Sequence, residues 1–251
     1  MVVKVLKNFG INTNFGSMNN MKKLLLLFLV SFSFIVSAYA DSRNFSFKVN
    51  NTKINVRTPD GFYESSYILP GRLDMVRTMY PDSLTVQVVL LPKGASDYER
   101  ISRYFILATS NMLDKRKSSQ KFFNEFRDLL REQQFTMLNK YRDEFDKAMK
   151  DGALRLTNKN DIKYEFQLGE TTPLGVFVDN KKVISTNSIS NMNVSVDGVN
   201  DNFLQTNTMS VVFLKNKFIY VYAYSDFDSE KDIIWIEAKT KELVNLLIKN
   251  N

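Results

Sequence analysis

The sequence predicts an α+β protein with a mainly antiparallel sheet of about six to eight strands, one long central helix and a C-terminal helix packed on the sheet. Three observations support this. Several short segments alternate apolar and polar residues with period two, as half-buried strands do. Residues 118–150 have helical periodicity, and the last segment opens with a helix-capping sequence. Runs of strands with helices inserted, rather than strict strand–helix alternation, indicate α+β.

Two alternating segments, 45–49 and 53–57, open the folded part as antiparallel strands. A two-residue loop at Asn50-Asn51 places all their apolar side chains on one face, but it sets Lys48 opposite Lys53. A four-residue loop keeps the faces and avoids that repulsion, so both loops remain open. A three-residue loop would put the apolar sets on opposite faces, and we discount it.

The next elements are short. Residues 58–61, Thr-Pro-Asp-Gly, predict a turn, since Pro fixes φ and Gly accepts a positive φ. A short helix is expected over 71–79, which lies between two prolines. Strands are expected over 84–91 and 103–109. The first of these ends apolar on both faces, as a central strand does.

The longest predicted element is a helix over 118–150. It is expected to end at Asp151-Gly152, because glycine suits the left-handed position after a helix. Such a helix is about 45 Å long, more than the width of a compact sheet, so one end should project or the helix should kink near Gln133-Gln134. Its apolar stripe comprises Phe122, Phe126, Leu129, Leu130, Phe135, Leu138, Tyr141, Phe145 and Met149.

Short strands are expected over 162–168, 175–178 and 182–189, with Asp179-Asn180 as the turn between the last two. Residues 191–203 are rich in Asn, Asp and Ser around Asp197-Gly198, and we predict a loop there.

The C-terminal part combines a hairpin and a helix. Strands 206–214 and 217–225 pair across Lys215-Asn216. A capping box at Ser229–Asp232 opens the final helix. Its inward side chains are Ile233, Ile236, Leu243, Val244 and Leu247.

The composition excludes several chemistries. The 251 residues contain no His and no Cys, so a Ser-His-Asp triad, an imidazole metal ligand, a thiolate nucleophile and an iron–sulfur cluster are all impossible. We therefore expect no cofactor and no tightly bound transition metal, since only oxygen ligands of the calcium or magnesium type remain. The hydrophobic fraction of 44% is ordinary for a globular protein.

Residues 21–40 have the three parts of a secretory signal peptide. Met21-Lys22-Lys23 is cationic, Leu24–Val36 is apolar, and Ala38-Tyr39-Ala40 fits the small-residue cleavage rule. The apolar run is shorter than the ~20 residues that span a bilayer. Cleavage before Asp41 is therefore favoured over an uncleaved membrane anchor.

The signal peptide divides the chain into three parts. Residues 1–20 are expected to be an unstructured upstream extension, which results from an early start codon or forms a long n-region. Residues 21–40 are the signal peptide, and 41–251 form a single α+β domain. We predict export to the periplasm or the medium.

Loss of residues 1–40 would leave 30 basic and 27 acidic residues, a net charge of +3 instead of +7. A nucleic-acid-binding protein should keep its positive excess in the folded part, so we expect no nucleic-acid partner. The run Lys115-Arg116-Lys117, beside Asp114, is interpreted as a solvated loop. The expected partner is an envelope protein or a small ligand, with membrane contact only through the signal peptide before cleavage.

Residues 118–121 contain a Ser-x-x-Lys spacing, which allows Lys to activate Ser in penicillin-recognising enzymes. The supporting Lys-Thr-Gly element is missing, and the nearest string is Lys239-Thr240-Lys241. Serine near a helix start is common as an N-cap, which we favour here.

Two further patterns concern acids. Glycosidases need two carboxylates about 5–10 Å apart, and candidates outside the long helices include Glu64, Glu99, Glu170 and Asp179. Their spacing does not distinguish them from solvated surface.

Asn193-x-Ser195-x-Asp197-Gly198 resembles half a calcium loop, but Leu204 stands where a bidentate Glu is needed, and we reject it.

An aromatic row on the last strand supplies the candidate surface residues, Tyr220, Tyr222 and Tyr224, which follow Phe218 on one face. Such a row is a platform for a sugar, peptide or lipid, or it is core beneath a helix. The partner strand offers apolar residues to the same face, which favours core. We predict that Tyr222 packs beneath a helix near the middle of the sheet.

Two segments carry a family resemblance. Residues 54–62 (INVRTPDGF) resemble the early strand and turn of an uncharacterised exported α+β protein family of Gram-negative bacteria, and residues 217–225 (KFIYVYAYS), with Trp235 following, resemble its ending. The order of elements over 45–248 is loosely similar to the Mog1/PsbP-like fold. The resemblance implies no catalytic residues.

The expected function is that of an exported, periplasmic, non-catalytic binding or accessory module of the cell envelope. The alternative is a small envelope hydrolase that uses carboxylate or Ser/Lys chemistry. Clustered, buried acids in one cleft would favour the hydrolase, whereas a shallow surface with an aromatic or Asn-rich patch would favour the binding module.

Overall fold

The computed structural model describes residues 43–96 and 100–251, with only the backbone at 134, 135 and 137–139. The described residues belong to one compact unit. The predicted upstream extension, 1–20, and signal peptide, 21–40, lie outside the described residues. No helix within the described ranges is both long and apolar enough to cross a membrane.

The fold is α+β, as predicted. A seven-stranded antiparallel sheet has the order β3-β4-β5-β9-β8-β7-β6, and β1 and β2 form a separate two-stranded sheet. The strands are β1 Asn44–Val49, β2 Thr52–Arg57, β3 Phe62–Glu64, β4 Leu84–Pro92, β5 Arg103–Ser110, β6 Tyr164–Asp179, β7 Val183–Val196, β8 Val199–Leu214 and β9 Lys217–Asp226. The helices are α3 Ser65–Ile68, α4 Pro70–Met79, α5 Asn111–Asp114, α6 Gln120–Lys140, α7 Arg142–Asn160 and α8 Glu230–Lys249.

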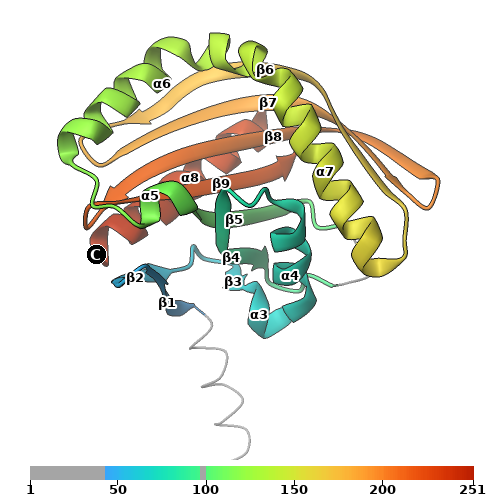
Figure 1. Cartoon of the computed structure of the whole chain (residues 1–251), viewed down its shortest axis with the longest axis horizontal. Helices are drawn as coiled ribbons and strands as arrows, with labels where there is room; N and C mark the ends of the chain where they lie inside the picture. The colour runs from blue at the N-terminus through green and yellow to red at the C-terminus, as the bar shows by residue number, and fades with distance from the viewer. Residues whose placement is uncertain (1–42, 97–99) are drawn as a thin grey trace, which may run out of the picture. The chain divides into compact units, whose positions relative to one another are not determined.

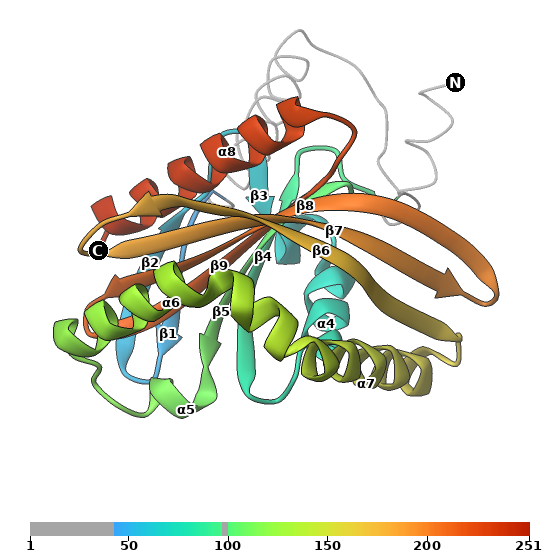
Figure 2. The ribbon, with the colours of Figure 1, turned by 90° about the horizontal axis from the view of Figure 1, so that it is seen from above.

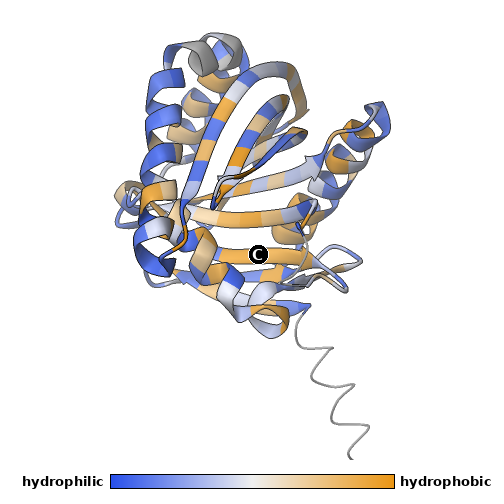
Figure 3. Ribbon diagram, turned by 90° about the vertical axis from the view of Figure 1, so that its right-hand side faces the viewer, coloured by the Kyte–Doolittle hydropathy of each residue, from blue (hydrophilic) through white to orange (hydrophobic). Residues whose placement is uncertain are grey.

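The helices form two layers on the large sheet. Helix α8 lies on one face, which we call the α8 face, and α4, α6 and α7 lie on the other, the multi-helix face (Figures 1 and 2). Apolar residues are concentrated in the central strands, whereas the long outer strands mix apolar and polar residues (Figure 3).

The α8 face carries one continuous core. Ile236, Leu243 and Leu247 of α8 are fully buried against the central strands and against the β1–β2 hairpin. Polar groups under the helix are paired. Thr208 and Thr240 share a hydrogen bond of 2.8 Å, and the amide of Asn187 donates to Glu237 at 2.6 Å. Pairing removes the cost of burying these groups.

The multi-helix face carries three separate cores. One lies under α6 around Phe123 and Phe213, and a second lies under α4 around Val89 and Ile106. The third lies under α7 around Leu156.

The β1–β2 hairpin has the two-residue loop at Asn50-Asn51, which settles the loop length that the sequence left open. Phe47 faces Ile54 in the register, and Lys48 faces Lys53. Asn50 takes a positive φ of 52°, which the short loop requires. The opposed lysines are both exposed to solvent, where their repulsion is weak.

The prediction of one helix over 118–150 was wrong in its bounds. The chain forms two helices that meet at Tyr141, whose ψ of 18° interrupts the first, and no break occurs near Gln133-Gln134. Gly152 does not end a helix. It lies inside α7, where an added Cβ would come within 2.6 Å of the Met79 carbonyl oxygen of α4. Asp161, with a φ of 54°, ends the helix instead.

The break also changes the predicted apolar stripe. Leu130 is buried as expected, but the most buried ring of α6 is Phe123, which the stripe omits. Tyr141 and Phe145, next to the break, are 39% and 47% exposed. The side chains of Phe135 and Leu138 lie outside the description.

The predicted loop at 191–203 is instead a hairpin of β7 and β8. Asn193 pairs with Asn202, and the strands turn at Asp197-Gly198, both with positive φ. Asp-Gly is a strong hairpin signal, and the polar composition reflects strands that extend beyond the core. The segments 162–168 and 175–178 are one irregular strand, β6, whose register shifts surround Gly169 and Pro173. An edge strand tolerates both residues.

The C-terminal predictions are confirmed. Strands β8 and β9 pair across Lys215-Asn216, and the capping box of Ser229 and Asp232 is formed. The two segments of the family resemblance also meet, because the ring centroids of Phe62 and Trp235 lie 6.1 Å apart.

Candidate functional site

The tyrosine row lies on β9, the middle strand of the sheet, and faces the multi-helix layer. Tyr222 packs in the core under α4, with its ring centroid 6.1 Å from that of Tyr80. The prediction that Tyr222 packs beneath a helix near the middle of the sheet is confirmed. Tyr220 stacks on Tyr222 at 6.5 Å and borders the α6 core, and both side chains are half-buried.

Tyr224 is tied into the sheet by polar and aromatic contacts. Its hydroxyl lies 3.0 Å from that of Tyr80, and its ring stacks on Tyr104 at 4.7 Å. Burial raises the pKa of Tyr104 to about 12, although a hydrogen bond with Gln205 acts in the other direction. Burial also raises the pKa values of Tyr80 and Tyr224. These hydroxyls stay protonated at neutral pH and serve packing rather than proton transfer.

A polar ladder extends this face from β8 to β6. The Ser188 hydroxyl donates to Asn207 Oδ1 at 2.7 Å, and the Asn207 amide donates to Ser190 at 3.1 Å. Ser190 in turn lies 3.1 Å from the hydroxyl of Thr171. Because the ladder satisfies its own groups, it holds strands together and leaves few donors for a ligand.

An open depression of about 750 Å³ lies between α7 and the far ends of β6, β7 and β8. Phe166 faces Val194 and Val194 faces Asp201 in the register, so these side chains share the face below α7. The residues between them line the depression through their backbone, because side chains alternate along a strand. It is enclosed by residues of α7 and of the strands, which are Lys150, Ala153, Leu154, Thr157, Tyr164, Phe166, Val194 and Asp201.

The floor of the depression is aromatic and its rim is charged. The rings of Tyr164 and Phe166 lie 6.1 Å apart, and Leu154 of α7 is 59% exposed beside them. At the rim, Asp201 lies 3.7 Å from Arg100, and Lys150 of α7 adds a further cation. The shape suits an apolar group that carries polar ends.

The candidate acids do not come together. Glu64 is on β3 and Glu170 is on β6, the two edges of a seven-stranded sheet. At about 4.8 Å per strand they are on the order of 29 Å apart. Asp179 stands nine residues after Glu170 on the same extended strand. Glu99 lies outside the described residues.

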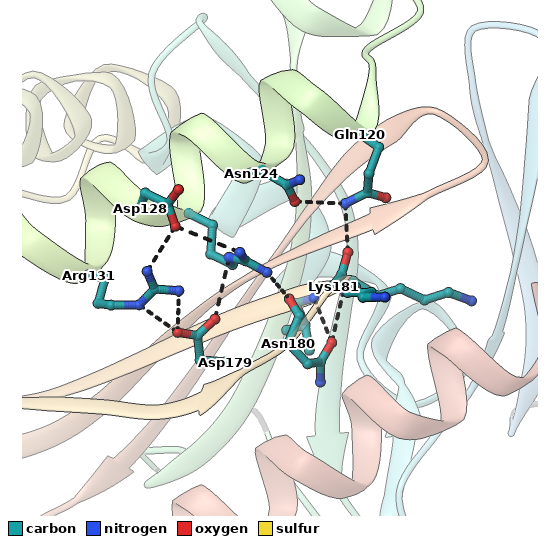
Figure 4. Close-up of polar contacts among 10 residues, drawn as sticks. Gln120, Asn124, Asp128, Arg131, Asp179, Asn180 and Lys181 are labelled. Carbon is teal, nitrogen blue, oxygen red and sulfur yellow. Dashed lines mark hydrogen bonds and ion pairs between the residues drawn. The ribbon is translucent and has the colours of Figure 1, made fainter.

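Two of these acids have structural partners. Glu64 accepts hydrogen bonds from the backbone and hydroxyl of Ser66 at the start of α3. Asp179 accepts from Arg131 at 2.7 Å and lies 3.5 Å from Arg127 (Figure 4). Arg127 also donates to the Asn180 carbonyl at 3.0 Å, which fastens α6 to the β6–β7 turn.

The Ser-x-x-Lys spacing places no nucleophile beside a base. Ser119 caps α6, because its hydroxyl accepts the Phe122 N–H at 3.1 Å. The Lys121 side chain is 87% exposed and lies 4.0 Å from Glu125. Neither Ser118 nor Ser119 makes a hydrogen bond to Lys121 in the described structure.

The described residues contain no group of three acidic side chains placed to hold a metal ion. In the rejected half calcium loop, Asn193 and Ser195 lie on β7 and Asp197 forms the hairpin turn. The Asp197 carboxylate accepts the backbone N–H of Lys163 at 2.8 Å. Its role is therefore to pin the start of β6 to the hairpin.

The chain matches no family model and no curated protein. Among solved structures it is similar to the Ran-binding protein Mog1p of Saccharomyces cerevisiae, with 10% identity and a TM-score of 0.36 over 82% of this chain and 93% of Mog1p. A mutant of the protein Mog1 gives the same identity and TM-score over 82% of this chain and 94% of that one. A likeness of this size carries no argument about partners or function.

Sequence reasoning missed the depression. Its floor comes from Tyr164, Phe166 and Val194, which alternate with polar residues along two strands. The alternation was visible, but its meaning depends on α7 continuing past Gly152 to form the opposite wall. Because the helix was expected to end there, no wall was predicted.

Proposed function

We propose that this protein is an exported, non-catalytic binding or accessory module of the cell envelope. The observation that carries the proposal is the open depression between α7 and the β6–β8 ends, with its aromatic floor and charged rim. Its volume lies within the ~300–1,000 Å³ of typical small-molecule sites. The depression would accept an apolar group of a small ligand or of a partner protein.

The arrangement of acids and hydroxyls supports binding over hydrolysis. The acid at the rim, Asp201, lies beside Arg100, and its side chain is 53% exposed. An exposed carboxylate beside a cation is poorly placed to act as a general acid. Two of the acids that the sequence suggested have structural roles: Glu64 caps α3, and Asp179 holds α6 through Arg131.

A neutral apolar fluorophore tests binding in the depression directly. N-phenyl-1-naphthylamine should bind the folded protein with a rise in fluorescence, and Leu154→Asp should weaken this binding at least tenfold. Ile234→Asp is the matched control, because Ile234 of α8 is 69% exposed and lies outside the depression. Equal binding by both variants would contradict the proposal.

The hydrolase alternative is tested on the same preparations. Turnover of p-nitrophenyl esters or glycosides should not exceed that of buffer. Turnover that Ser118→Ala or Lys121→Ala abolishes would instead establish the hydrolase and overturn the proposal.

Export is tested by the N-terminus of the protein in the cell. The proposal expects a periplasmic or secreted protein that begins at Asp41, because Ala38-Tyr39-Ala40 fits the cleavage rule. A start at Tyr39 would only move the cleavage site. A membrane-bound protein that retains Met21 would contradict cleavage.

A further inference from the structure

Several turns meet at one end of the large sheet. The α5–α6 segment touches the β8–β9 turn, where Ser118 N–H donates to the Asn216 carbonyl at 3.0 Å. The start of α6 touches the β6–β7 turn, where the Gln120 amide donates to the Lys181 carbonyl at 2.8 Å. These contacts join three segments that are far apart in the sequence into one surface.

This surface carries a dense group of cations, which we call the basic end. Its members are exposed side chains from three turns that these contacts join. They are Lys115, Arg116, Lys117, Lys181, Lys182 and Lys215. The β1–β2 hairpin adds exposed Lys53 beside them, because Lys215 Nζ donates to the Lys53 carbonyl at 2.9 Å.

The charges of the basic end are not neutralised locally. None of its six members forms an ion pair with an acid of the described residues. Asp114 precedes the Lys-Arg-Lys run, but its carboxylate accepts from the Thr109 hydroxyl at 2.6 Å, and burial raises its pKa. Asp179, beside the β6–β7 turn, forms ion pairs with Arg127 and Arg131. The positive potential is therefore open to solvent.

The backbone of the basic end is held in place from below. Lys217 is only 5% exposed, and its ammonium donates to the carbonyls of Asp114 and Arg116. This buried ammonium bends the segment into a turn that displays Lys115, Arg116 and Lys117 outward. The N-terminus of α6, a helix of 21 residues, begins just after this turn and adds its partial positive charge.

Two exposed apolar side chains flank the cationic run. Met112 of α5 is 71% exposed, and Phe122 of α6 is 43% exposed. Cations together with apolar side chains match a surface that offers both negative charge and hydrocarbon, which a bilayer of anionic lipid does. A purely charged partner, such as nucleic acid, would make no use of Met112.

The opposite end of the long strands carries acids. The β7–β8 hairpin, with Asp197 and Asp201, lies at the end away from the β8–β9 turn, because the strands are antiparallel. Asp201 has a cation beside it, since Arg100 lies 3.7 Å away, whereas the cations of the basic end have no acidic partner among the described residues.

We propose that the basic end docks the folded domain on an anionic phospholipid surface. The sequence predicts membrane contact only through residues 21–40, and the basic end gives the folded part a contact of its own. The proposal does not depend on the depression under α7, which lies at the other end of the strands.

The test compares binding of the full chain to vesicles of phosphatidylcholine with and without one-third phosphatidylglycerol. The readout is the ratio of the two partition coefficients. Residues 1–40 carry four lysines of their own, so the variants below, which leave these residues unchanged, isolate the contribution of the folded part. The expected ratio exceeds ten at ~50 mM salt and falls toward one at ~500 mM, since salt screens the attraction.

Charge reversal locates the contact. The triple variant Lys115→Glu, Arg116→Glu, Lys117→Glu should lower the ratio at least fivefold. The matched control reverses Lys93, Lys147 and Lys231, which are exposed, lie on other parts of the surface and change the net charge equally. The control should keep a ratio above half that of the parent protein.

A second variant guards against misfolding of the first. Lys181→Glu with Lys182→Glu, on a separate turn, should lower the ratio at least fivefold while the urea midpoint stays unchanged. A parent ratio near one would overturn the proposal, and so would equal losses in test and control variants. Tighter binding of a DNA duplex than of anionic vesicles at the same salt would assign the surface to nucleic acid instead.

Discussion

The two faces of the large sheet are built differently. The α8 face has one helix over one continuous core, and hydrogen bonds pair Thr208 with Thr240 and Asn187 with Glu237 beneath the helix. The multi-helix face has three cores under three helices, with half-buried tyrosines and exposed apolar side chains between them. From this difference we infer that the α8 face supplies most of the stability. The multi-helix face tolerates openings such as the depression beside α7.

The length of the strands explains the difference. Strands β6, β7 and β8 have 16, 14 and 16 residues. A single helix is too short to cover their whole length. On the multi-helix face the chain breaks at Tyr141 to cover the sheet with two helices. Each change of helix leaves a seam, and side chains at a seam are partly exposed.

The largest effect is expected on the α8 face. Leu243→Ala should lower the free energy of unfolding by ~2–5 kcal/mol, because Leu243 is fully buried in the continuous core. Ile234→Ala, on the exposed side of the same helix, should change it by less than ~0.5 kcal/mol. Urea titration of both variants measures this, and similar losses would contradict the burial pattern.

A smaller effect is expected at the tyrosine row. Tyr222→Ala should cost ~2–3 kcal/mol, less than the ~3–5 kcal/mol of a fully buried ring, because the side chain is half-buried. Tyr222→Phe should be nearly neutral, since the hydroxyl has no hydrogen-bond partner among the described residues. If the urea midpoint of Tyr222→Ala hardly differs from that of the parent protein, the tyrosine row is a surface platform and not part of the core.

The crossing of α4 and α7 gives the next effect. Gly152→Ala should destabilise the protein by ~1–3 kcal/mol, because the new Cβ would meet the Met79 carbonyl oxygen at 2.6 Å. Gly71→Ala in α4 is the control, since no atom lies within 4 Å of its added Cβ. The control should be neutral or slightly stabilising. Thermal unfolding of the pair decides whether the helices touch at Gly152.

The smallest effect is a pH dependence on the multi-helix face. Tyr104 has its pKa raised to about 12 by burial, against about 10 in an unfolded chain. The protonated form therefore stabilises the fold fully below pH 10, and this contribution is lost as the pH rises to 12. The loss is about 1 kcal/mol at pH 11.

Tyr104→Phe checks this dependence. Its urea midpoint should fall less steeply between pH 9 and pH 11 than that of the parent protein. An equally steep fall in the variant would mean that Tyr104 ionises as freely in the fold as in the unfolded chain.

Local sequence patterns correctly predicted the elements in the centre of the fold, where other elements cover the sheet on both sides. The alternation in β9 and β8, the turn at Lys215-Asn216 and the capping box at Ser229 all gave the observed structure. Prediction failed where a residue has a tertiary role. Gly152 resembles a helix end in sequence, but it serves the contact with α4, and only the fold shows that contact.

The candidate sites show the same limit. The sequence identified Tyr220, Tyr222 and Tyr224 because they alternate on one strand. The depression needs α7, β6 and β8 together, and the basic end needs three separate turns. Spacing along a chain cannot reveal residues that only long-range contacts bring together.

Native-state hydrogen exchange tests the contrast between the two faces most directly. Amides of α8, β8 and β9 should exchange only through global unfolding, whereas amides of α6 and α7 should exchange through smaller openings with lower free energy. Both sets can be followed in one sample by mass spectrometry of peptides across urea concentrations. Exchange of α7 as slow as that of α8, with the same urea dependence, would contradict the account.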